Sequence, residues 1–578
     1  MDKTPQLNVR TTSNYFLEGL NEIGVEYLFC NFGTDHAPLI EEMARWSREG
    51  KTFPKTILCP HENTAMHMAA GFANVTGRGQ AVMVHVDAGT ANCAMGAHNL
   101  RRTRVPVLLM AGKAPYTVRG ERVGARDNYV HFIQEPFDQG SIVRNYVKWE
   151  WTLPSGVITK EVLRRAHSVA HSDPPGPVYL MLPRETLAEE WDTSAVRSFP
   201  AEHYGAVHAG QADPAFIVTL ADRLIAAEHP IVVTSYAGRN AAAPKLLDEL
   251  AHFAGLRVFE SHPIHVNIPR DSDCFVGFAP GEALPKSDVG IMIDVDVPWI
   301  PTQVKENDAI YWAHIDIDVI KEDFPMWGFA SNLRMEANSE LAMRQLLAAL
   351  QTRATPAFKA KVAARLQVIA EESRARREKV AKAEQNRGMQ GAVNPAYVCA
   401  EVARRLAPSD IIVNEAVRNV PTVMNHVPRT EPGTYHGFAG GGLGCSGGIA
   451  LGAKLARPAA TVVQFVGDGG FYFNNPSSLY SVSKQYRLPI LSVVLDNSGW
   501  SAVKEATLRM YGQGEAFSSN EFQAGLQSDV DFAKVAESVG GHGERVSDPE
   551  ALPAAVDRAM AAVRGGKPTV LHVKIPSI

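Results

Sequence analysis

Residues 462–500 read VVQFVGDGGFYFNNPSSLYSVSKQYRLPILSVVLDNSGW, and this stretch decides the fold. It holds two apolar, β-branched runs, VVQFV and ILSVVL, and each run leads into a turn that contains glycine. Apolar runs of this length with a helical pattern between them predict parallel strands that are buried on both faces. The carboxyl ends of such strands meet at one edge of the sheet, where open α/β folds bind ligands.

The rest of the chain repeats this alternation of short apolar runs and helical patterns. We therefore predict an α/β protein with three doubly wound parallel-sheet domains, at residues 1–190, 205–355 and 391–578. A highly charged helical connector is expected at residues 356–390, before the third domain. Further strands are predicted at residues 25–33, 81–86, 105–112, 177–182, 230–238, 289–297, 309–318, 409–415 and 568–575.

The composition is that of an ordinary soluble protein and excludes several partners. The chain has 578 residues, too many for one core, with 45% hydrophobic and 21% charged residues. The net charge is −5 without a basic stripe, so neither nucleic acid nor a membrane surface is an expected partner. The polar N-terminus and the lack of a long apolar run predict no signal peptide and no transmembrane helix. Six scattered cysteines without a CxxC pair favour a reduced, cytoplasmic protein.

The two strand ends carry oxygen ligands that suit a hard cation. Asp468 offers a carboxylate, Asn497 an amide oxygen and Gly499 a backbone carbonyl, and Mg²⁺ prefers such ligands together with a phosphate. Gly469 and Gly470 allow backbone N–H groups to approach phosphate oxygens at the start of the next helix. Asp-Gly alone is a common turn pair, so the prediction depends on the second strand end at this distance.

This arrangement resembles the diphosphate- and metal-binding motif of the thiamine diphosphate enzymes, the family of acetolactate synthase, pyruvate decarboxylase and benzoylformate decarboxylase. The resemblance implies thiamine diphosphate and Mg²⁺ as cofactors. It also implies a pyrimidine-binding, a central and a diphosphate-binding domain, in that order. The first of the family's two usual asparagines is Asp496 here, so Asn497 is taken as the metal ligand.

A second part of the resemblance lies in the first domain. The sequence predicts a helix that begins after Pro60 and ends at Gly77, with Glu62 in its first turn and Gly71 nine residues later. By resemblance, Glu62 faces the pyrimidine ring of the cofactor and protonates a ring nitrogen, although a capping role in the helix is the simpler alternative.

The segment FAGGGLG at residues 438–444 resembles the loop that bends the cofactor in this family. The resemblance implies that Leu443 is wedged between the two rings and that the Gly441 carbonyl accepts a hydrogen bond from the amino group. A flexible turn or phosphate-binding nest is the alternative.

Four side chains are candidates for contact with the substrate. His85, in HVDAGT, resembles the active-site histidine loop of benzoylformate decarboxylases, with a spacing one residue longer after it and a structural histidine as the alternative. Asp35 and His36 replace the usual Pro-Gly of a loop that projects at the reacting carbon, and either could act there, unless Asp35 caps a helix. Gln134 resembles the glutamine in the Phe-Gln-Glu stretch of acetolactate synthases, with a surface-loop position as the alternative.

Three more residues complete the predicted cofactor site. Arg418 and Asn419, in IVNEAVRN, resemble the phosphate contacts of benzoylformate decarboxylases. Trp500 is expected in an apolar wall over the substrate, with core packing as the alternative. Val503 stands where pyruvate decarboxylases carry a glutamate, so that activity is not expected.

The sequence therefore predicts a 2-oxo acid decarboxylase or carboligase, which releases an aldehyde or joins the substrate to a second carbonyl. A 2-hydroxyacyl-CoA lyase or a C–C hydrolase of the same family remains an alternative, as does a non-catalytic homologue. A flavin oxidase is a further alternative, because residues 235–240 could hold FAD, although nothing else supports it. The resemblance implies a dimer or tetramer with active sites at the subunit interface.

Overall fold

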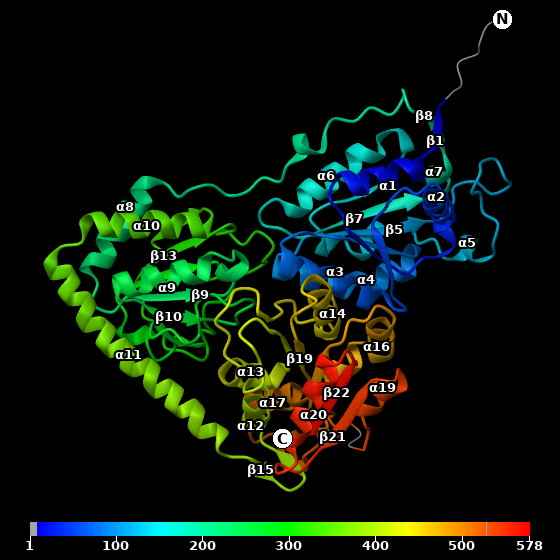
Figure 1. Cartoon of the computed structure of the whole chain (residues 1–578). Helices are drawn as coiled ribbons and strands as arrows, with labels where there is room; N and C mark the ends of the chain where they lie inside the picture. The colour runs from blue at the N-terminus through cyan, green and yellow to red at the C-terminus, as the bar shows by residue number, and fades with distance from the viewer. Residues whose placement is uncertain (1–7, 527–528, 578) are drawn as a thin grey trace, which may run out of the picture. The chain divides into compact units, whose positions relative to one another are not determined.

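The computed structural model describes residues 8–526 and 529–577 and confirms the α/β fold. It contains three six-stranded sheets, and the bridges within each of them are parallel. Figure 1 shows the N-terminal sheet in blue and cyan, the central sheet in green and the C-terminal sheet in yellow to red. Each sheet lies within one of the three predicted domain ranges, although the domain limits themselves stay a prediction. Within the described ranges, no helix is long and apolar enough to cross a membrane.

The N-terminal sheet has the strand order β3-β2-β4-β5-β7-β6. Its buried strands carry the β-branched and apolar runs that the sequence predicted, and Leu28, Met83, Met110 and Leu180 pack in one core cluster. The strands are β2 (Tyr27–Cys30), β3 (Lys55–Leu58), β4 (Ala81–Val84), β5 (Val107–Lys113), β6 (Glu150–Thr152) and β7 (Pro177–Pro183). The edge strands β3 and β6 were not predicted, because polar and partly exposed residues interrupt their apolar pattern.

The central sheet has the order β11-β10-β9-β12-β13-β14. The chain order reverses between β9 and β12, which is the position where open α/β sheets form a ligand crevice. The strands are β9 (Ile231–Thr234), β10 (Arg257–Glu260), β11 (Phe275–Gly277), β12 (Val289–Ile293), β13 (Tyr311–Asp316) and β14 (Leu333–Glu336).

The C-terminal sheet has the order β18-β17-β19-β20-β22-β21. Strands β19 and β20 are direct neighbours, with Val463 opposite Leu491 and Gly467 opposite Leu495. The strands are β17 (Ile411–Glu415), β18 (Tyr435–His436), β19 (Val462–Gly467), β20 (Leu491–Asp496), β21 (His542–Val546) and β22 (Thr569–Lys574). This register brings the two strand ends of the decisive motif side by side.

The charged connector is the helix α11 (Pro356–Glu384), which is shorter than predicted. It begins at the N-cap Thr355 and buries Phe358, Val362 and Ile369, while most of its charged residues face solvent and Arg365 is buried. The prediction of a helix to residue 390 is wrong, because Gly388 has a φ of +98° and begins a short hairpin. That hairpin pairs β15 (Gly388–Met389) with β16 (Ala392–Val393).

The chain divides into two compact units. The first comprises the described residues through Val207 together with Gly440–Ala459 and Phe471–Pro489, and the second comprises the remainder. Within the first unit, α14 (Ser446–Ala456) packs against α3 (Glu62–Thr76) at very close range. A Cβ atom on Gly71 would lie 2.1 Å from the Ile449 carbonyl oxygen, and one on Gly452 would lie 2.1 Å from that of Met68. Glycine is therefore required at both positions for the two helices to touch.

Candidate active site

The strand ends of the C-terminal sheet bring three candidate metal ligands together. Asp468 begins α15 (Asp468–Phe473) directly after β19, and Asn497 and Gly499 follow β20. The Gly499 N–H donates to Oδ2 of Asp468 at 2.9 Å and to Oδ1 of Asn497 at 3.1 Å. Both side-chain oxygens therefore converge on the same point. The Asn497 amide also donates to the Ser501 hydroxyl, which fixes its oxygen toward Asp468.

The two aspartates of this motif have opposite electrostatic environments. Burial, with a smaller contribution from the nearby Asp496 carboxylate, raises the pKa of Asp468 to about 6. Burial also opposes ionisation of Asp496, but hydrogen bonds from His572 and Lys574 outweigh it and lower the pKa of Asp496 to about 2. The Asp496 Oδ2 lies 2.8 Å from His572 Nε2 and 3.0 Å from Lys574 Nζ. Asp496 is thus held by Lys574 and His572, whereas within the described residues no ion pair joins Asp468 to a Lys or Arg side chain.

These residues fit a divalent cation shared with a phosphate. A buried carboxylate with a raised pKa is stabilised in its charged form when a cation binds beside it. The donors are one carboxylate and one amide oxygen, which suits Mg²⁺ and leaves further positions to phosphate oxygens and water. In the described part of the chain, no group of three or more His, Cys, Asp or Glu side chains is placed to hold a metal. A site built from protein carboxylates and imidazoles alone is therefore not the alternative here.

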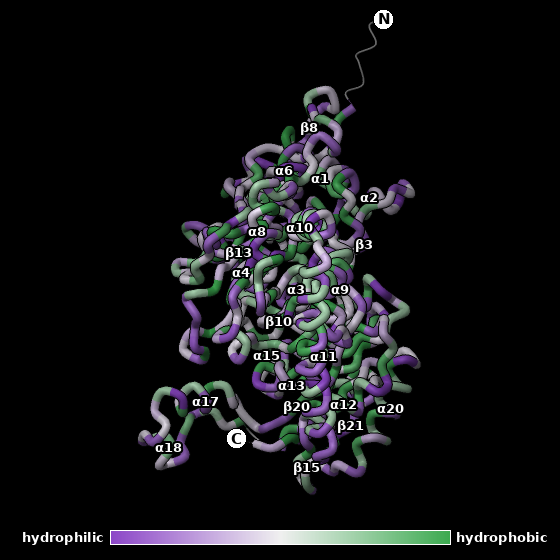
Figure 2. The backbone as a smooth tube through the Cα atoms, turned by 90° about the vertical axis from the view of Figure 1, so that its left-hand side faces the viewer, coloured by the Kyte–Doolittle hydropathy of each residue, from purple (hydrophilic) through white to green (hydrophobic). Residues whose placement is uncertain are grey.

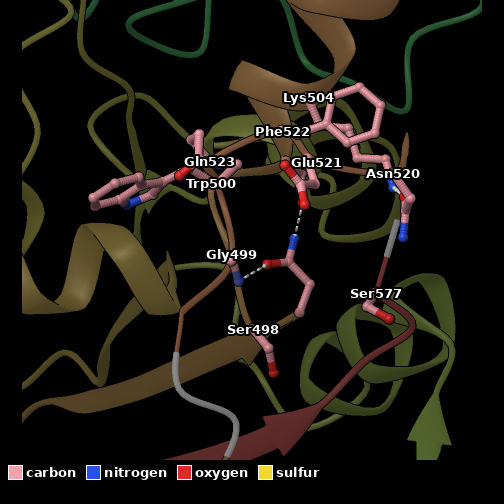
Figure 3. Close-up of a pocket in the computed structure, with 13 residues that line it drawn as sticks. Ser498, Gly499, Trp500, Lys504, Asn520, Glu521, Phe522, Gln523 and Ser577 are labelled. Carbon is pink, nitrogen blue, oxygen red and sulfur yellow. Dashed lines mark hydrogen bonds between the residues drawn. The ribbon is translucent and has the colours of Figure 1, made fainter. Parts of the chain in front are cut away.

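A cavity of about 290 Å³ opens beside this motif. Figure 3 shows Trp500 on one side of it and Lys504 and Phe522 on the other. The Trp500 indole lies over Gly469, where an added Cβ would be 2.5 Å from the indole nitrogen. Trp500 is 40% exposed, so it lines the cavity and is not part of the core.

The predicted phosphate contacts lie around the end of β17. Arg418 and Asn419 belong to the 3-10 turn η8 (Val417–Asn419), and Asn419 is buried. The Arg418 guanidinium lies 2.8 Å from Glu505 on α17 (Ser501–Met510), so it is engaged in an ion pair in this structure. Gly470 lies near the Glu415 carbonyl at the same strand end.

In the first unit, Glu62 is the first residue of α3, and the helix ends at Gly77 as predicted. The N-cap is His61, whose Nδ1 accepts from the Asn63 N–H. Glu62 is therefore not the cap, and its carboxylate accepts a hydrogen bond from Asn92 at 2.9 Å.

The predicted wedge loop is held against the helix of Glu62. Asn63 donates to the Gly444 carbonyl at 2.8 Å. On α4 (Val86–Thr103), Asn99 donates to the Gly442 carbonyl at 2.8 Å and accepts from the Gly442 N–H at 3.1 Å. Gly441 has a φ of +76° and Gly444 a φ of +95°, which favour glycine. Leu443 is half-buried in this loop. Glu62 and Leu443 both belong to the first compact unit.

His85 and Asp35 form a hydrogen-bonded pair at the carboxyl edge of the N-terminal sheet. The Asp35 Oδ1 lies 2.5 Å from His85 Nδ1, and its Oδ2 accepts from the Val86 N–H at the start of α4. An added Cβ on Gly112 would be 1.4 Å from Asp35 Oδ2, and one on Gly33 would be 1.9 Å from His85 Nδ1. Two glycines therefore make room for this pair.

Among Asp35, His36 and His85, His85 is the one that is partly exposed. Asp35 and His36 are fully buried, so a direct role for either of them on a substrate is not supported by their position. Asp35 does not cap its own helix but sits within the 3-10 turn η1 (Thr34–His36). Hydrogen bonding to Asp35 raises the pKa of His85, and Gln134 contributes in the same direction. Gln134, which ends α5 (Val130–Ile133), therefore lies beside His85.

Sequence reasoning missed several residues of this site. Asn92, Asn63 and Asn99 hold Glu62 and the wedge loop, yet asparagines on helices carry no distinctive spacing. Lys574 pairs with Asp496 because the two lie opposite each other on β22 and β20, and this register is not visible in the sequence.

The glycine of the central stretch at residues 235–240 has a packing role. An added Cβ on Gly238 would be 1.9 Å from the Val266 carbonyl oxygen. Close contact inside the domain therefore explains this glycine without a nucleotide.

Comparison with known families and proteins matches two ranges of the chain. The N-terminal TPP binding domain of thiamine pyrophosphate enzymes matches residues 10–142, and the C-terminal TPP binding domain matches residues 419–573. The chain is 26% identical to benzoylformate decarboxylase of Pseudomonas aeruginosa, over 99% of this chain and 100% of that protein. It is also 26% identical to the acetolactate synthase isozyme 3 large subunit of Escherichia coli, over 90% and 88% of the two chains.

Solved structures share the fold over the full length. Benzoylformate decarboxylase from Polynucleobacter necessarius superposes with a TM-score of 0.76 at 16% identity, covering 98% of each chain. The 4-hydroxybenzoylformate decarboxylase of Rhodococcus jostii RHA1 superposes with a TM-score of 0.74 at 20% identity, covering 98% of this chain and 100% of that one.

Proposed function

Because the chain belongs to the thiamine pyrophosphate enzymes, we propose that it decarboxylates a 2-oxo acid and either releases an aldehyde or joins the product to a second carbonyl. The observation that supports this most is the strand-end motif of the C-terminal sheet. There the Asp468 and Asn497 oxygens converge within hydrogen-bond distance of the same Gly499 N–H, and burial raises the pKa of the Asp468 carboxyl group.

The cofactor would be shared between two copies of the chain, with Asp468 supplied by one copy and Glu62 by the other. Asp468, Asn497 and the Gly499 carbonyl would bind Mg²⁺. The N–H groups at Gly469 and Gly470, with Arg418 and Asn419, would face the diphosphate. Glu62 would face the pyrimidine ring, with the Gly441 carbonyl accepting from its amino group and Leu443 and Trp500 packing against the rings.

Bound thiamine diphosphate supplies the nucleophilic carbon and the electron sink for loss of CO₂. The protein's own part is orientation and proton transfer. Glu62 would hold a proton at the pyrimidine ring, with its carboxylate oriented by Asn92. His85, kept basic by Asp35, would act as the acid at the substrate carbonyl. Gln134, beside His85, would orient the substrate.

Self-association in the cytoplasm is part of this proposal. Figure 2 shows α17 and α18 (Glu515–Ser519) standing apart from strands β20 and β21 of the same unit. Exposed apolar side chains mark this segment: Trp500, Val503, Met510, Tyr511 and Phe517. Large exposed apolar patches mark sites of association, which supports a dimer or tetramer with active sites at the interface.

All six cysteines are free and buried, in keeping with a reducing compartment.

The test is CO₂ release from a panel of aliphatic and aromatic 2-oxo acids, with thiamine diphosphate and Mg²⁺ added. Glu62→Gln should lower kcat by at least about 10²-fold, as loss of one acid–base group does. Glu371→Gln, on the exposed face of α11, is the matched control and should keep full activity.

Other outcomes separate the alternatives. If the cofactor binds but no acid releases CO₂, decarboxylation is wrong, and lyase or hydrolase chemistry on acyl-CoA or diketone substrates is tested next. Failure to bind the cofactor would indicate a non-catalytic homologue. A yellow colour of the purified protein would indicate a flavin.

A further inference from the structure

The turn that follows β20 carries two of the candidate metal ligands and has an unusual backbone conformation. Ser498 lies between Asn497 and Gly499 and has a φ of +60°, in the left-handed region that serine rarely adopts. Figure 3 shows Ser498 and Gly499 at the wall of the cavity. A residue keeps such a conformation only where the surrounding contacts impose it. The contacts of this turn therefore decide where the ligand oxygens lie.

Lys574, on β22, connects this turn to the end of β20. Its Nζ donates to Oδ2 of Asp496 at 3.0 Å and to the Ser498 hydroxyl. Asp496 and Lys574 are opposite each other in the register of the two strands, which places the ammonium group next to the turn. The Lys574 side chain is 18% exposed and that of Asp496 is 4% exposed, so salt screens this contact only weakly. We call these three residues the Lys574 bridge.

Both oxygens of the Asp496 carboxylate contact protein groups. Oδ2, which accepts from Lys574, also lies 2.8 Å from Nε2 of the buried His572. Oδ1 accepts from the Ser498 N–H at 2.8 Å. A carboxylate next in sequence to a metal ligand is itself a candidate ligand for Mg²⁺. The Lys574 bridge instead engages this carboxylate with β22 and with the backbone of the turn.

We propose that Lys574 is a positioning residue of the metal site, which holds the turn so that Asn497 presents its oxygen beside Asp468. This inference rests on the proposed function, which assigns Mg²⁺ to that site. In this conformation the Asn497 and Asp468 oxygens share the Gly499 N–H. Lys574 binds neither the cation nor the substrate and acts through its two hydrogen-bond partners.

The positive charge of Lys574 separates this role from a purely electrostatic one. A cationic side chain beside a metal site repels the metal ion, so its removal alone would strengthen metal binding. Removal of a group that orients metal ligands has the opposite effect and typically weakens metal binding about 10–100-fold. The two roles therefore predict changes of opposite sign.

The experiment measures the Kd of Mn²⁺, used as a paramagnetic probe, by electron paramagnetic resonance in the presence of thiamine diphosphate. Lys574→Met keeps a side chain of similar length without the ammonium group, and we expect the Kd to rise about 10–100-fold. Lys574→Arg keeps the charge and the donors and should recover most of the affinity. Lys534→Met is the matched control and should bind Mn²⁺ as wild type does, because that lysine pairs with Glu537 on the surface of α19 (Ala533–Ser538).

Ser498→Ala tests the other end of the Lys574 bridge. It removes the hydroxyl and keeps a Cβ atom, so the strain of the positive φ remains. We expect the Kd of Mn²⁺ to rise about three- to tenfold, as for loss of one hydrogen bond to a charged group. The double variant Ser498→Ala/Lys574→Met should bind Mn²⁺ no more weakly than Lys574→Met, because the two residues act as a unit. Urea denaturation shows whether each variant folds, and if Lys574→Met does not, Ser498→Ala decides.

An unchanged or lower Kd in Lys574→Met overturns the proposal. Wild-type affinity in Ser498→Ala overturns it as well, and so does a double variant whose loss is the product of the two single losses. Because Mn²⁺ binding needs no substrate, these failures are distinct from failure of the proposed function. If the Kd rises in both single variants but no 2-oxo acid releases CO₂, decarboxylation is wrong and the role of Lys574 stands. If wild type binds no Mn²⁺, or Asp468→Asn binds it as tightly as wild type, the metal site and the role of Lys574 are both overturned.

Discussion

Asp468 and Asp35 occupy equivalent places in two different sheets, and the environments of their carboxylates are opposite. Each is buried at the carboxyl edge of a six-stranded parallel sheet, close to the start of a helix. The pKa of Asp468 is raised by burial and by Asp496, whereas that of Asp35 is lowered, because His36 and His85 outweigh the effect of burial. The Asp468 edge of the C-terminal sheet is therefore suited to bind an added cation. At the edge of the N-terminal sheet, the Asp35 carboxylate already interacts with His36 and His85.

The largest expected effect follows from removing the Asp468 carboxylate. Asp468→Asn should abolish binding of Mn²⁺, used as a paramagnetic probe for Mg²⁺, and lower CO₂ release by at least about 10³-fold. Asp35→Asn should leave Mn²⁺ binding within about threefold of wild type, since that edge needs no added cation. Electron paramagnetic resonance of Mn²⁺ with thiamine diphosphate measures both variants. Equal loss of Mn²⁺ binding in the two would contradict the distinction.

The Asp35–His85 pair at the edge of the N-terminal sheet is tested by Gly112→Ala. Because the new methyl group would lie 1.4 Å from Asp35 Oδ2, the Asp35–His85 pair has to move. We expect the free energy of unfolding to fall by about 1–3 kcal/mol, as in other overpacked interiors. Urea denaturation measures it, with Gly210→Ala as the control, since a Cβ there meets no atom within 4 Å. Unchanged stability would show that the pair is not confined by this glycine.

The same pair predicts how stability depends on pH. The folded-state pKa of His85 is raised above its unfolded value, so the stability it adds is fully present below about pH 6.5 and is lost as the pH rises through the folded pKa. The pKa of Asp35 is lowered, so its own contribution is present above about pH 4 and is constant in this range. The stability difference between wild type and Asp35→Asn should therefore shrink as the pH rises above about 6.5. Urea denaturation at several pH values tests this, and a difference that grows with pH would reverse the assignment.

What the sequence could predict at these two edges differs for a physical reason. Asp468, Asn497 and the helix of Glu62 follow from local patterns, because strand ends, turns and caps are determined by neighbouring residues. The pairing of Asp496 with Lys574 depends on the register of β20 and β22, and the burial of Asp35 depends on Gly112, which is 77 positions away in the chain. The contact of Thr34 with His131 likewise joins the 3-10 turn η1 to the helix α5. Long-range packing of this kind leaves no periodic signal, so only the structure reveals it.

The smallest expected effect concerns the loop that carries Leu443. Asn99→Ala removes two hydrogen bonds to Gly442, and loops held by few contacts gain freedom when such bonds are lost. Because the loop would still be tied to Asn63 through Gly444, we expect the apparent Kd for thiamine diphosphate to rise only about three- to tenfold. Fluorescence titration with the cofactor at saturating Mg²⁺ measures this change. Asn21→Ala is the matched control, because its side chain donates one bond to Thr52 on the surface. The wild type, Asn99→Ala and Asn21→Ala should all have the same affinity for Mn²⁺ without the cofactor. The reason is that Asn99 orders the wedge loop and not the strand ends at Asp468.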